Sequence, residues 1–526
     1  MSLLPFLAVA IVGTVIATLL RDIRRLGTLV GLGAVVVALA AACLINPDTP
    51  LGIGGGALAG SDHLRLVLTL CLGGGLLVLV VARLSTWQPS APGALLGGAA
   101  GIGLALGLAG TPPGLLGAAA ATIAASAIAL GSPAAPSRIR ALARELRGAA
   151  TSLVIGLIAA GIVPGTAAAR APGAGPAEPA AAALVLLGMA LVVAHRFGAI
   201  PLHARVSRLA DAAPSGALPI LAAWLPAAWG LVILGWAPAA LGPSSAGLGL
   251  ERSLVVTLAL ATLLLGTVAA LIQDEVEHVV AYTIVADAGV ALLALAALDP
   301  AARDAARAWV LVFATTRTAM IGWTIAFRAA FGTGRLRDTT GWLRRAPALG
   351  VALAGILVAA VGWPGLLAWD ARLAILQSAT AGPALLLAYA GSLGTGAAIF
   401  RLLVVGGGRP SAIVAGSLGE LPRLPARPVA GAAAAVTDGA PPVGAIATAG
   451  ALARAGALAS RLRVAAPAVS RDALRTLELN RVPLRAFAVI LLGGLALLTA
   501  AGAFGIDAAA RAPGPVLPSL SPFVGG

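Results

Sequence analysis

The feature that most constrains this chain is a series of apolar runs, each about 20 residues long, that recurs along most of its length. A run of about 20 residues, when helical, crosses the hydrocarbon core of a bilayer. Of the 526 residues, 59% are hydrophobic and only 10% are charged, a balance that soluble domains do not have. The runs do not alternate between polar and apolar residues, which favours helices over a barrel. The sequence therefore predicts an all-α membrane protein.

We expect about fourteen transmembrane helices, numbered here as spans. The last span is expected after a long basic stretch, 405–484, which we interpret as one cytoplasmic loop because Asp438 and two adjacent prolines interrupt its apolar middle. The N-terminal run is interpreted as the first span rather than as a signal peptide, since no basic residue precedes it. The predicted spans are 4–20, 27–45, 64–83, 94–110, 114–131, 149–165, 180–198, 217–236, 252–271, 279–297, 306–328, 347–376, 383–404 and 485–505.

Arginines gather in the loops after spans 1, 3, 5, 7 and 11, which all lie on one side if the spans alternate. The positive-inside rule makes that side cytoplasmic and places both termini outside a bacterial inner membrane. The net charge of +15 is then explained by contact with anionic lipid rather than with nucleic acid. Two cysteines in apolar runs and only four histidines favour neither a disulfide nor a metal site. No phosphate-binding glycine loop is found, so we expect no cofactor in this chain.

Three arginines, Arg196, Arg317 and Arg372, lie within or at the edge of apolar runs. An arginine at the centre of a membrane helix costs roughly 2.5 to 3.5 kcal/mol on insertion, so each is a candidate functional residue. The alternative is an arginine without a functional role, whose side chain extends along the helix to the membrane interface. This is hardest for Arg317, which lies near the middle of its span. All 35 basic residues are arginine, which keeps its charge where lysine can lose it.

Two spans are predicted to be broken helices. Span 7 ends in His195 and Arg196 and is followed by Pro201 and His203, and span 12 contains Gly362-Trp-Pro-Gly365 followed by Asp370 and Arg372. Proline opens the helical backbone, and paired interrupted spans are typical of ion or substrate paths. Asp287, within span 10, is a further candidate partner for a buried arginine, while the acidic segment 273–278 before it is equally compatible with a solvated helix start.

These segments resemble the antiporter-like proton-pumping subunits of respiratory complex I. Arg196-Phe-Gly-Ala-Ile-Pro-Leu-His203 is similar to that family's "K…PLH" stretch, Gln273 to Gly289 to its "Q.D.KR.LAYS…H.G" segment, and 341–372 to its "GGL…P…G.P…GF..K/E" segment. The resemblance covers roughly 180–405. Relatives include membrane subunits of energy-converting hydrogenases, multisubunit cation/proton antiporters and inorganic-carbon uptake systems.

The resemblance implies two inverted five-helix repeats, spans 4–8 and 9–13, each with one broken helix, and a midplane chain of protonatable residues. The family's broken-helix lysine falls on Arg196, the lysine of span 11 on Arg317, and the second broken-helix Lys or Glu on Arg372. The lysine of span 8 falls on Ala227, and the glutamate expected in span 5 has no counterpart between Ala118 and Ser126. A relay needs groups that cycle between charged and neutral forms, so the first half-channel is expected to be disabled.

From the resemblance we expect a divergent membrane subunit of a larger redox- or transport-coupled complex, NADH-quinone-oxidoreductase-like or hydrogenase-like, with a weakened or altered proton path. Its expected partners are other membrane subunits, including paralogous antiporter-like ones, together with protons and anionic lipid. Whether the complex is an enzyme is left open, with no redox site expected in this chain. The alternatives are a competent proton channel that uses Asp287, Asp370, His195, His203 and water, and a standalone secondary transporter. The expected segments are 1–93, 94–250, 251–404, 405–484 and 485–526.

Overall fold

The computed structural model describes residues 2–46, 51–53, 56–85, 88–108, 112–131, 136–168, 179–241, 248–297, 299–411 and 481–506. The loop predicted at 405–484, and the choice against a fifteenth span within it, fall outside the described residues from 412 to 480. Within the described part, eleven helices are long and apolar enough to cross a membrane, and three more, Leu3–Leu19, Ala91–Gly107 and Pro347–Val361, are apolar but shorter. The prediction of an all-α membrane protein with about fourteen spans is confirmed.

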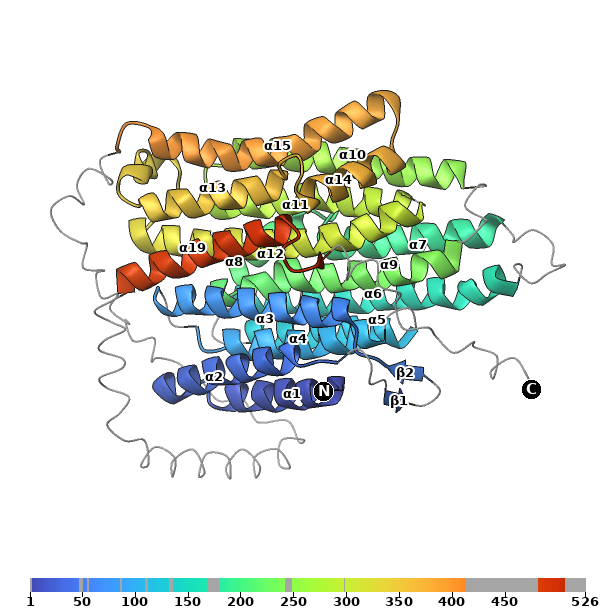
Figure 1. Ribbon diagram of the computed structural model, residues 1–526, viewed down its shortest axis with the longest axis horizontal. Helices are drawn as coiled ribbons and strands as arrows, with labels where there is room; N and C mark the ends of the chain where they lie inside the picture. The colour runs from blue at the N-terminus through green and yellow to red at the C-terminus, as the bar shows by residue number, and fades with distance from the viewer. Residues whose placement is uncertain are drawn as a thin grey trace, which may run out of the picture.

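The helices run side by side in one bundle, with the N-terminal pair at one edge and α15 at the other (Figure 1). The first five helices are α1 (Leu3–Leu19), α2 (Arg24–Cys43), α3 (Asp62–Arg83), α4 (Ala91–Gly107) and α5 (Pro112–Leu130). They are followed by α6 (Pro136–Ala168), α7 (Pro179–Phe197), α8 (Ala204–Ala212), α9 (Leu225–Leu241), α10 (Gly249–Ile272) and α11 (Val276–Ala296). The last helices are α12 (Pro300–Phe331), α13 (Pro347–Val361), α14 (Leu367–Ala379), α15 (Gly382–Gly407) and α19 (Arg481–Ala500).

A short antiparallel hairpin that the sequence did not predict links α2 to α3. Its strands β1 (Leu51–Ile53) and β2 (Gly56–Leu58) pair with Leu51 opposite Leu58 and Ile53 opposite Gly56. The hairpin lies beside the bundle rather than within it (Figure 1). It therefore does not alter the helical class of the fold.

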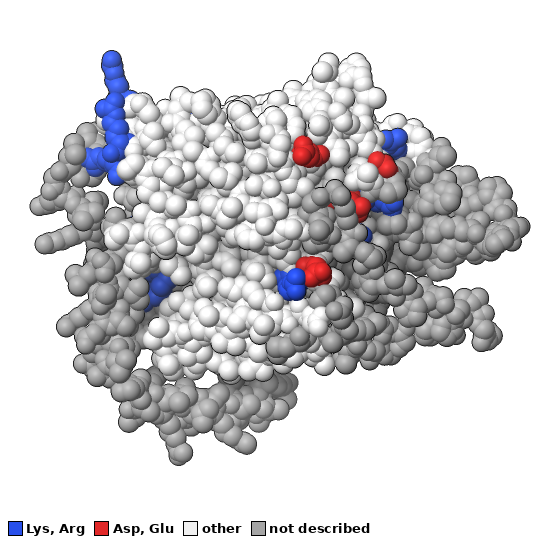
Figure 2. All heavy atoms as spheres, viewed as in Figure 1, with Lys and Arg blue, Asp and Glu red and all other residues white. Residues whose placement is uncertain are grey.

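The bundle has an apolar exterior as well as an apolar core. Leu250, Ile272, Val351 and Leu386 are each more than 60% exposed, although they lie on long apolar helices. Figure 2 shows one face, on which uncharged residues dominate and charged ones form a few separate spots. A contiguous apolar surface of this kind is suited to lipid or to the membrane faces of other subunits.

Small residues bring neighbouring helices close at two similar places. A Cβ atom on Gly117 of α5 would lie 2.6 Å from the backbone nitrogen of Ala105 in α4, and one on Gly266 of α10 would lie 2.6 Å from that of Ala286 in α11. Such close backbone approach is typical of helix pairs in membranes, where van der Waals packing replaces the hydrophobic effect. These contacts hold α5 against α4 and α10 against α11.

Both predicted helix breaks are confirmed. The first separates α7 from α8, with Gly198 in the left-handed region (φ 77°) and a cis bond before Pro201. The second separates α13 from α14, with Gly362 (φ 71°) and Gly365 (φ 90°) in conformations that favour glycine. A break exposes the last carbonyl groups of the first fragment, which then need donors from elsewhere.

One predicted boundary is wrong. The basic segment 138–147, expected as a loop after span 5, is helical and continuous with the apolar residues that follow it, so that α6 runs over 33 residues from Pro136 to Ala168. Arginine and glutamate are good helix formers, and the segment between Arg138 and Ala168 has no proline until Pro164. The helix therefore carries charged side chains directly into the bundle.

Candidate ion path

The three arginines singled out by sequence are all buried. The exposed fraction of the whole residue is 0% for Arg196, 1% for Arg317 and 6% for Arg372. None of them extends to the surface, so the alternative of a side chain at the membrane interface does not hold for them. Each must instead be satisfied by partners inside the bundle.

Arg196, at the end of α7, lies beside Glu145 of α6. Its Nη2 is 3.4 Å from Oε2 of Glu145, and its guanidinium carbon is 5.8 Å from the centre of the Trp229 ring of α9. A cation over the face of a tryptophan is attracted by the ring quadrupole. Among the described residues, Nε and Nη1 of Arg196 have no hydrogen-bond partner. The positive charge of Arg196 is therefore buried, and its contacts with Glu145 and Trp229 balance it only in part.

Glu145 binds a second arginine more tightly. Arg205 of α8 donates from Nε to Oε1 and from Nη2 to Oε2, both at 2.8 Å, in a two-bond pairing of guanidinium and carboxylate. Its Nη1 also donates to the backbone carbonyl of Arg196 at 2.6 Å. Arg205 thus holds the carboxylate with one edge and the end of α7 with the other.

Glu145 is the main residue that the sequence analysis missed. Helix α5 has no acid between Ala118 and Ser126, and the acid beside Arg196 comes from the next helix. Glu145, Gly148 and Ser152 are spaced i, i+3 and i+7 and share one face of α6. Ser152 Oγ lies 3.3 Å from His195 Nδ1, and the bare face of Gly148 leaves room for His195 and Arg196. That spacing was the available signal.

Arg317 of α12 forms a closed pair with Asp287 of α11. Its Nε and Nη2 lie 2.6 and 2.5 Å from Oδ2 of Asp287, and Nη1 donates to Thr283 Oγ1 at 3.0 Å. Both charged side chains are less than 5% exposed. Asp287 is therefore paired with a buried arginine, which is one of the two interpretations that the sequence allows for this segment.

Arg372 of α14 has carbonyl partners rather than an acid. Its Nη1 donates to Val361 O at 2.6 Å and its Nη2 to Ala360 O, the last turn of α13. It therefore caps the fragment on the other side of the break, as Arg205 does for α7. By contact, the counterpart of Arg372 is Arg205, whereas the family resemblance implies that Arg372 corresponds to Arg196.

Two other candidates lie apart from these clusters. Asp370 is exposed, and residues 370 and 372 face different sides of α14, as residues two apart on a helix do. Its role in an ion path stays a prediction. His203 is half-buried, and its Nδ1 has no hydrogen-bond partner among the described residues. Ala227, where the family has a lysine, is buried in α9. The part of the chain that is described brings no three His, Cys, Asp or Glu side chains together as a metal site would need.

The acidic segment at the start of α11 forms ion pairs with the end of α12 and with the chain that follows it. Asp274 pairs with Arg337 at 2.7 Å, Glu277 with Arg328 at 2.5 Å, and His278 lies 3.1 Å from Asp211 of α8. These side chains are largely or partly exposed. The segment is thus a charged surface patch at the start of a helix rather than part of the buried path.

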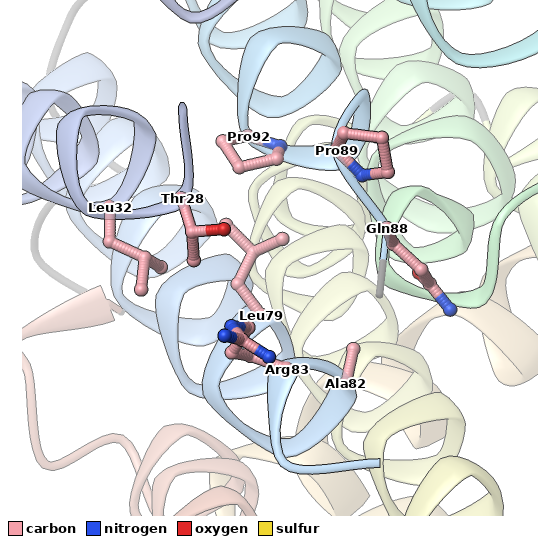
Figure 3. A pocket seen from close by; sticks show the side chains of 8 residues that line it. All are labelled: Thr28, Leu32, Leu79, Ala82, Arg83, Gln88, Pro89 and Pro92. Carbon is pink, nitrogen blue, oxygen red and sulfur yellow. The ribbon is translucent and has the colours of Figure 1, made fainter. Parts of the chain in front are cut away.

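The cavities nearest these groups differ in size. A pocket of about 340 Å³ opens beside Glu145 and His195, between α6 and the α7–α8 break. Beside Arg372 there is only a hollow of about 10 Å³, between α14 and α15. A third hollow of about 20 Å³, among α2, α3 and the segment before α4, is lined by Arg83 and Gln88 and lies far along the chain from these breaks (Figure 3). Water can therefore approach Glu145 and His195 more easily than Arg372.

Comparison with known proteins agrees with this architecture. Residues 174–397 match the family model described as NADH:quinone oxidoreductase/Mrp antiporter, TM. NADH-quinone oxidoreductase subunit N of Laribacter hongkongensis is 27% identical over 206 residues, which cover 37% of this chain and 40% of that protein. The matched stretch thus spans less than half of that relative.

Solved structures match over nearly the whole chain. A chain of respiratory complex I from Thermus thermophilus with bound NADH has a TM-score of 0.61 at 17% identity, covering 97% of this chain and all of that one. A chain of the Mrp complex from Dietzia has a TM-score of 0.68 at 17% identity, covering 97% of this chain and 51% of that one. At such low identity the likeness concerns the fold.

Proposed function

Because the chain belongs to the antiporter-like membrane subunits of respiratory complex I and related complexes, we propose that it works as one membrane subunit of a larger ion-translocating complex, with a proton path altered by fixed charge. Its partners would be other membrane subunits, some of them paralogous. Any redox chemistry would belong to those partners, and both termini would face the outside. The exposed apolar helix faces support a place within a membrane assembly.

One observation carries the proposal: both buried acids near the breaks are held by arginine. Glu145 is paired with Arg196 and Arg205, and Asp287 with Arg317. A carboxylate in a two-bond pairing is stabilised in its charged form, and the guanidinium cannot take over as a proton carrier. These pairs favour a fixed field over a relay of exchanging protons.

The pocket beside Glu145 and His195 favours a second candidate, a competent proton channel subunit. Its volume of about 340 Å³ provides room for water next to a carboxylate and a half-buried imidazole. Protons would then move through water, His195, His203, Asp287 and Asp370, with the arginines setting the field. The exposed position of Asp370 weighs against this route.

Flux measurements distinguish the two candidates. The full chain, reconstituted into vesicles containing a pH-sensitive dye, should show little proton flux when a pH gradient or potential is applied. Strong flux that Asp287→Asn abolishes and that Asp22→Asn leaves intact would establish the channel instead; Asp22 is 87% exposed and serves as the matched control. Purification in mild detergent, with identification of the proteins that co-purify, tests membership of a complex separately.

A further inference from the structure

The pocket between α6 and the first break is strongly basic. Arg144 and Arg208 are exposed and line it, Arg205 lines it from α8, and Arg196 lies behind it against Glu145. Among the described residues that line the pocket, Glu145 is the only acid. Three arginines therefore line a pocket that has one carboxylate, and a fourth arginine contacts that carboxylate from behind.

The carboxylate of Glu145 cannot neutralise the positive charges of Arg144 and Arg208. Both of its oxygens are occupied by Arg205, and Arg196 approaches one of them. Within the described part of the chain, no ion pair joins Arg144 or Arg208 to an acid. A pocket with excess positive charge and low-dielectric walls raises the local concentration of anions.

The shape and the donors indicate the class of anion. The volume of about 340 Å³ lies within the range of about 300–1,000 Å³ in which small-molecule sites fall. Guanidinium groups form paired hydrogen bonds with the oxygens of phosphate or carboxylate groups. Helix α8 lines the pocket with one side, from Ala204 to Leu209, and this side carries both Arg205 and Arg208.

We propose that this pocket binds a phosphate-class oxyanion, held by Arg144 and Arg208 with the charge of Arg205 and Arg196 behind them. The oxyanion could be a free ion or the headgroup of an anionic lipid, because two of the arginines that line the pocket, Arg144 and Arg208, are exposed. The proposal does not depend on whether the chain moves protons.

The test uses the full chain in detergent after lipid removal, with two probes. Thermal stabilisation by inorganic phosphate, at constant ionic strength set with chloride, measures the free ion. Native mass spectrometry with phosphatidylglycerol, compared with phosphatidylethanolamine, measures the headgroup. Arg144→Gln and Arg208→Gln should each weaken binding about tenfold, the loss of one charge-assisted hydrogen bond. Arg147→Gln is the control, since Arg147 is exposed on the same helix but does not line the pocket.

Loss of phosphate binding in both pocket variants, with Arg147→Gln unaffected, supports a free ion; the same pattern for phosphatidylglycerol supports a headgroup. Arg208→Lys keeps the charge but loses the planar fork, so intermediate binding is expected. The proposal is overturned if neither probe binds the unmodified chain, or if the pocket variants and Arg147→Gln weaken binding equally. Because Arg144 and Arg208 are exposed, all variants should retain the unfolding temperature of the unmodified chain.

Discussion

In the segment α4–α9, the buried acid Glu145 lies beside a pocket, whereas in the segment α10–α15 the buried acid Asp287 is enclosed. Glu145 is shared by two arginines and lines a pocket of about 340 Å³, while Asp287 pairs with Arg317, which also donates to Thr283, and both charged side chains of that pair are less than 5% exposed. Both segments cap the first fragment of the broken helix with an arginine from the second. The same backbone plan therefore supports one charge cluster that borders a pocket and one whose acid and arginine are enclosed by the described helices.

The largest effect should come from removing the enclosed acid. Asp287→Ala leaves Arg317 buried without its partner, which typically costs about 3–5 kcal/mol of folding stability. Glu145→Ala should cost less, about 1–3 kcal/mol, because water from the pocket can solvate the arginines that it releases. Thermal unfolding of the purified variants in detergent measures both.

Asp370→Ala is the control for this pair, because Asp370 is an exposed acid in the same segment as Asp287. An equal loss of stability from Asp287→Ala and Glu145→Ala would contradict the contrast between an enclosed and an open cluster. A large loss from Asp370→Ala would show that the assay responds to any change of charge.

A smaller effect, equal in the two segments, is expected at the close helix contacts. In Gly117→Ala and Gly266→Ala the added methyl group would meet a backbone nitrogen at 2.6 Å. Overpacking of this kind costs about 1–3 kcal/mol. Gly73→Ala on α3, where nothing lies within 4 Å of the added carbon, should leave the unfolding temperature unchanged. Unequal losses at Gly117 and Gly266 would show that the two helix pairs are not packed alike.

The smallest effect is expected at the surface. Arg337 pairs with Asp274 but is 83% exposed, and exposed pairs contribute about 0–1 kcal/mol. Arg337→Gln should therefore shift the unfolding temperature only slightly, and less at high salt. A loss comparable to that from Asp287→Ala would overturn the distinction drawn here between buried and surface pairs.

The parts that sequence predicted are those with strong local signals. Apolar runs gave the spans, and the glycines and prolines at 198–201 and 362–365 gave the breaks, because these residues constrain their own backbone. The burial of Arg196, Arg317 and Arg372 followed from their place within apolar runs. Their role in moving ions stays a prediction.

The missed parts depend on which helix face points inward. Glu145 lies among four arginines on the sequence, so its segment resembles a loop, and the spacing of Glu145, Gly148 and Ser152 along one helix face is a weak local signal that the acid is buried. The exposure of Asp370 has the same origin, since only the packing of α14 against its neighbours decides which of its sides is buried. On the sequence, Arg205 resembles one of several arginines in a loop, although it forms the shortest side-chain hydrogen bonds at the α7–α8 break.

The arginine caps at the two breaks have a consequence for how this chain could change over time. Replacing Arg372 by a lysine or glutamate would supply a titratable group, but it would also release the carbonyl ends of Ala360 and Val361. Regaining proton exchange and keeping the α13–α14 junction rigid are thus competing demands on one side chain. Another hydrogen-bond donor for these carbonyl groups would therefore have to appear before Arg372 could be replaced by a titratable residue without loosening the junction.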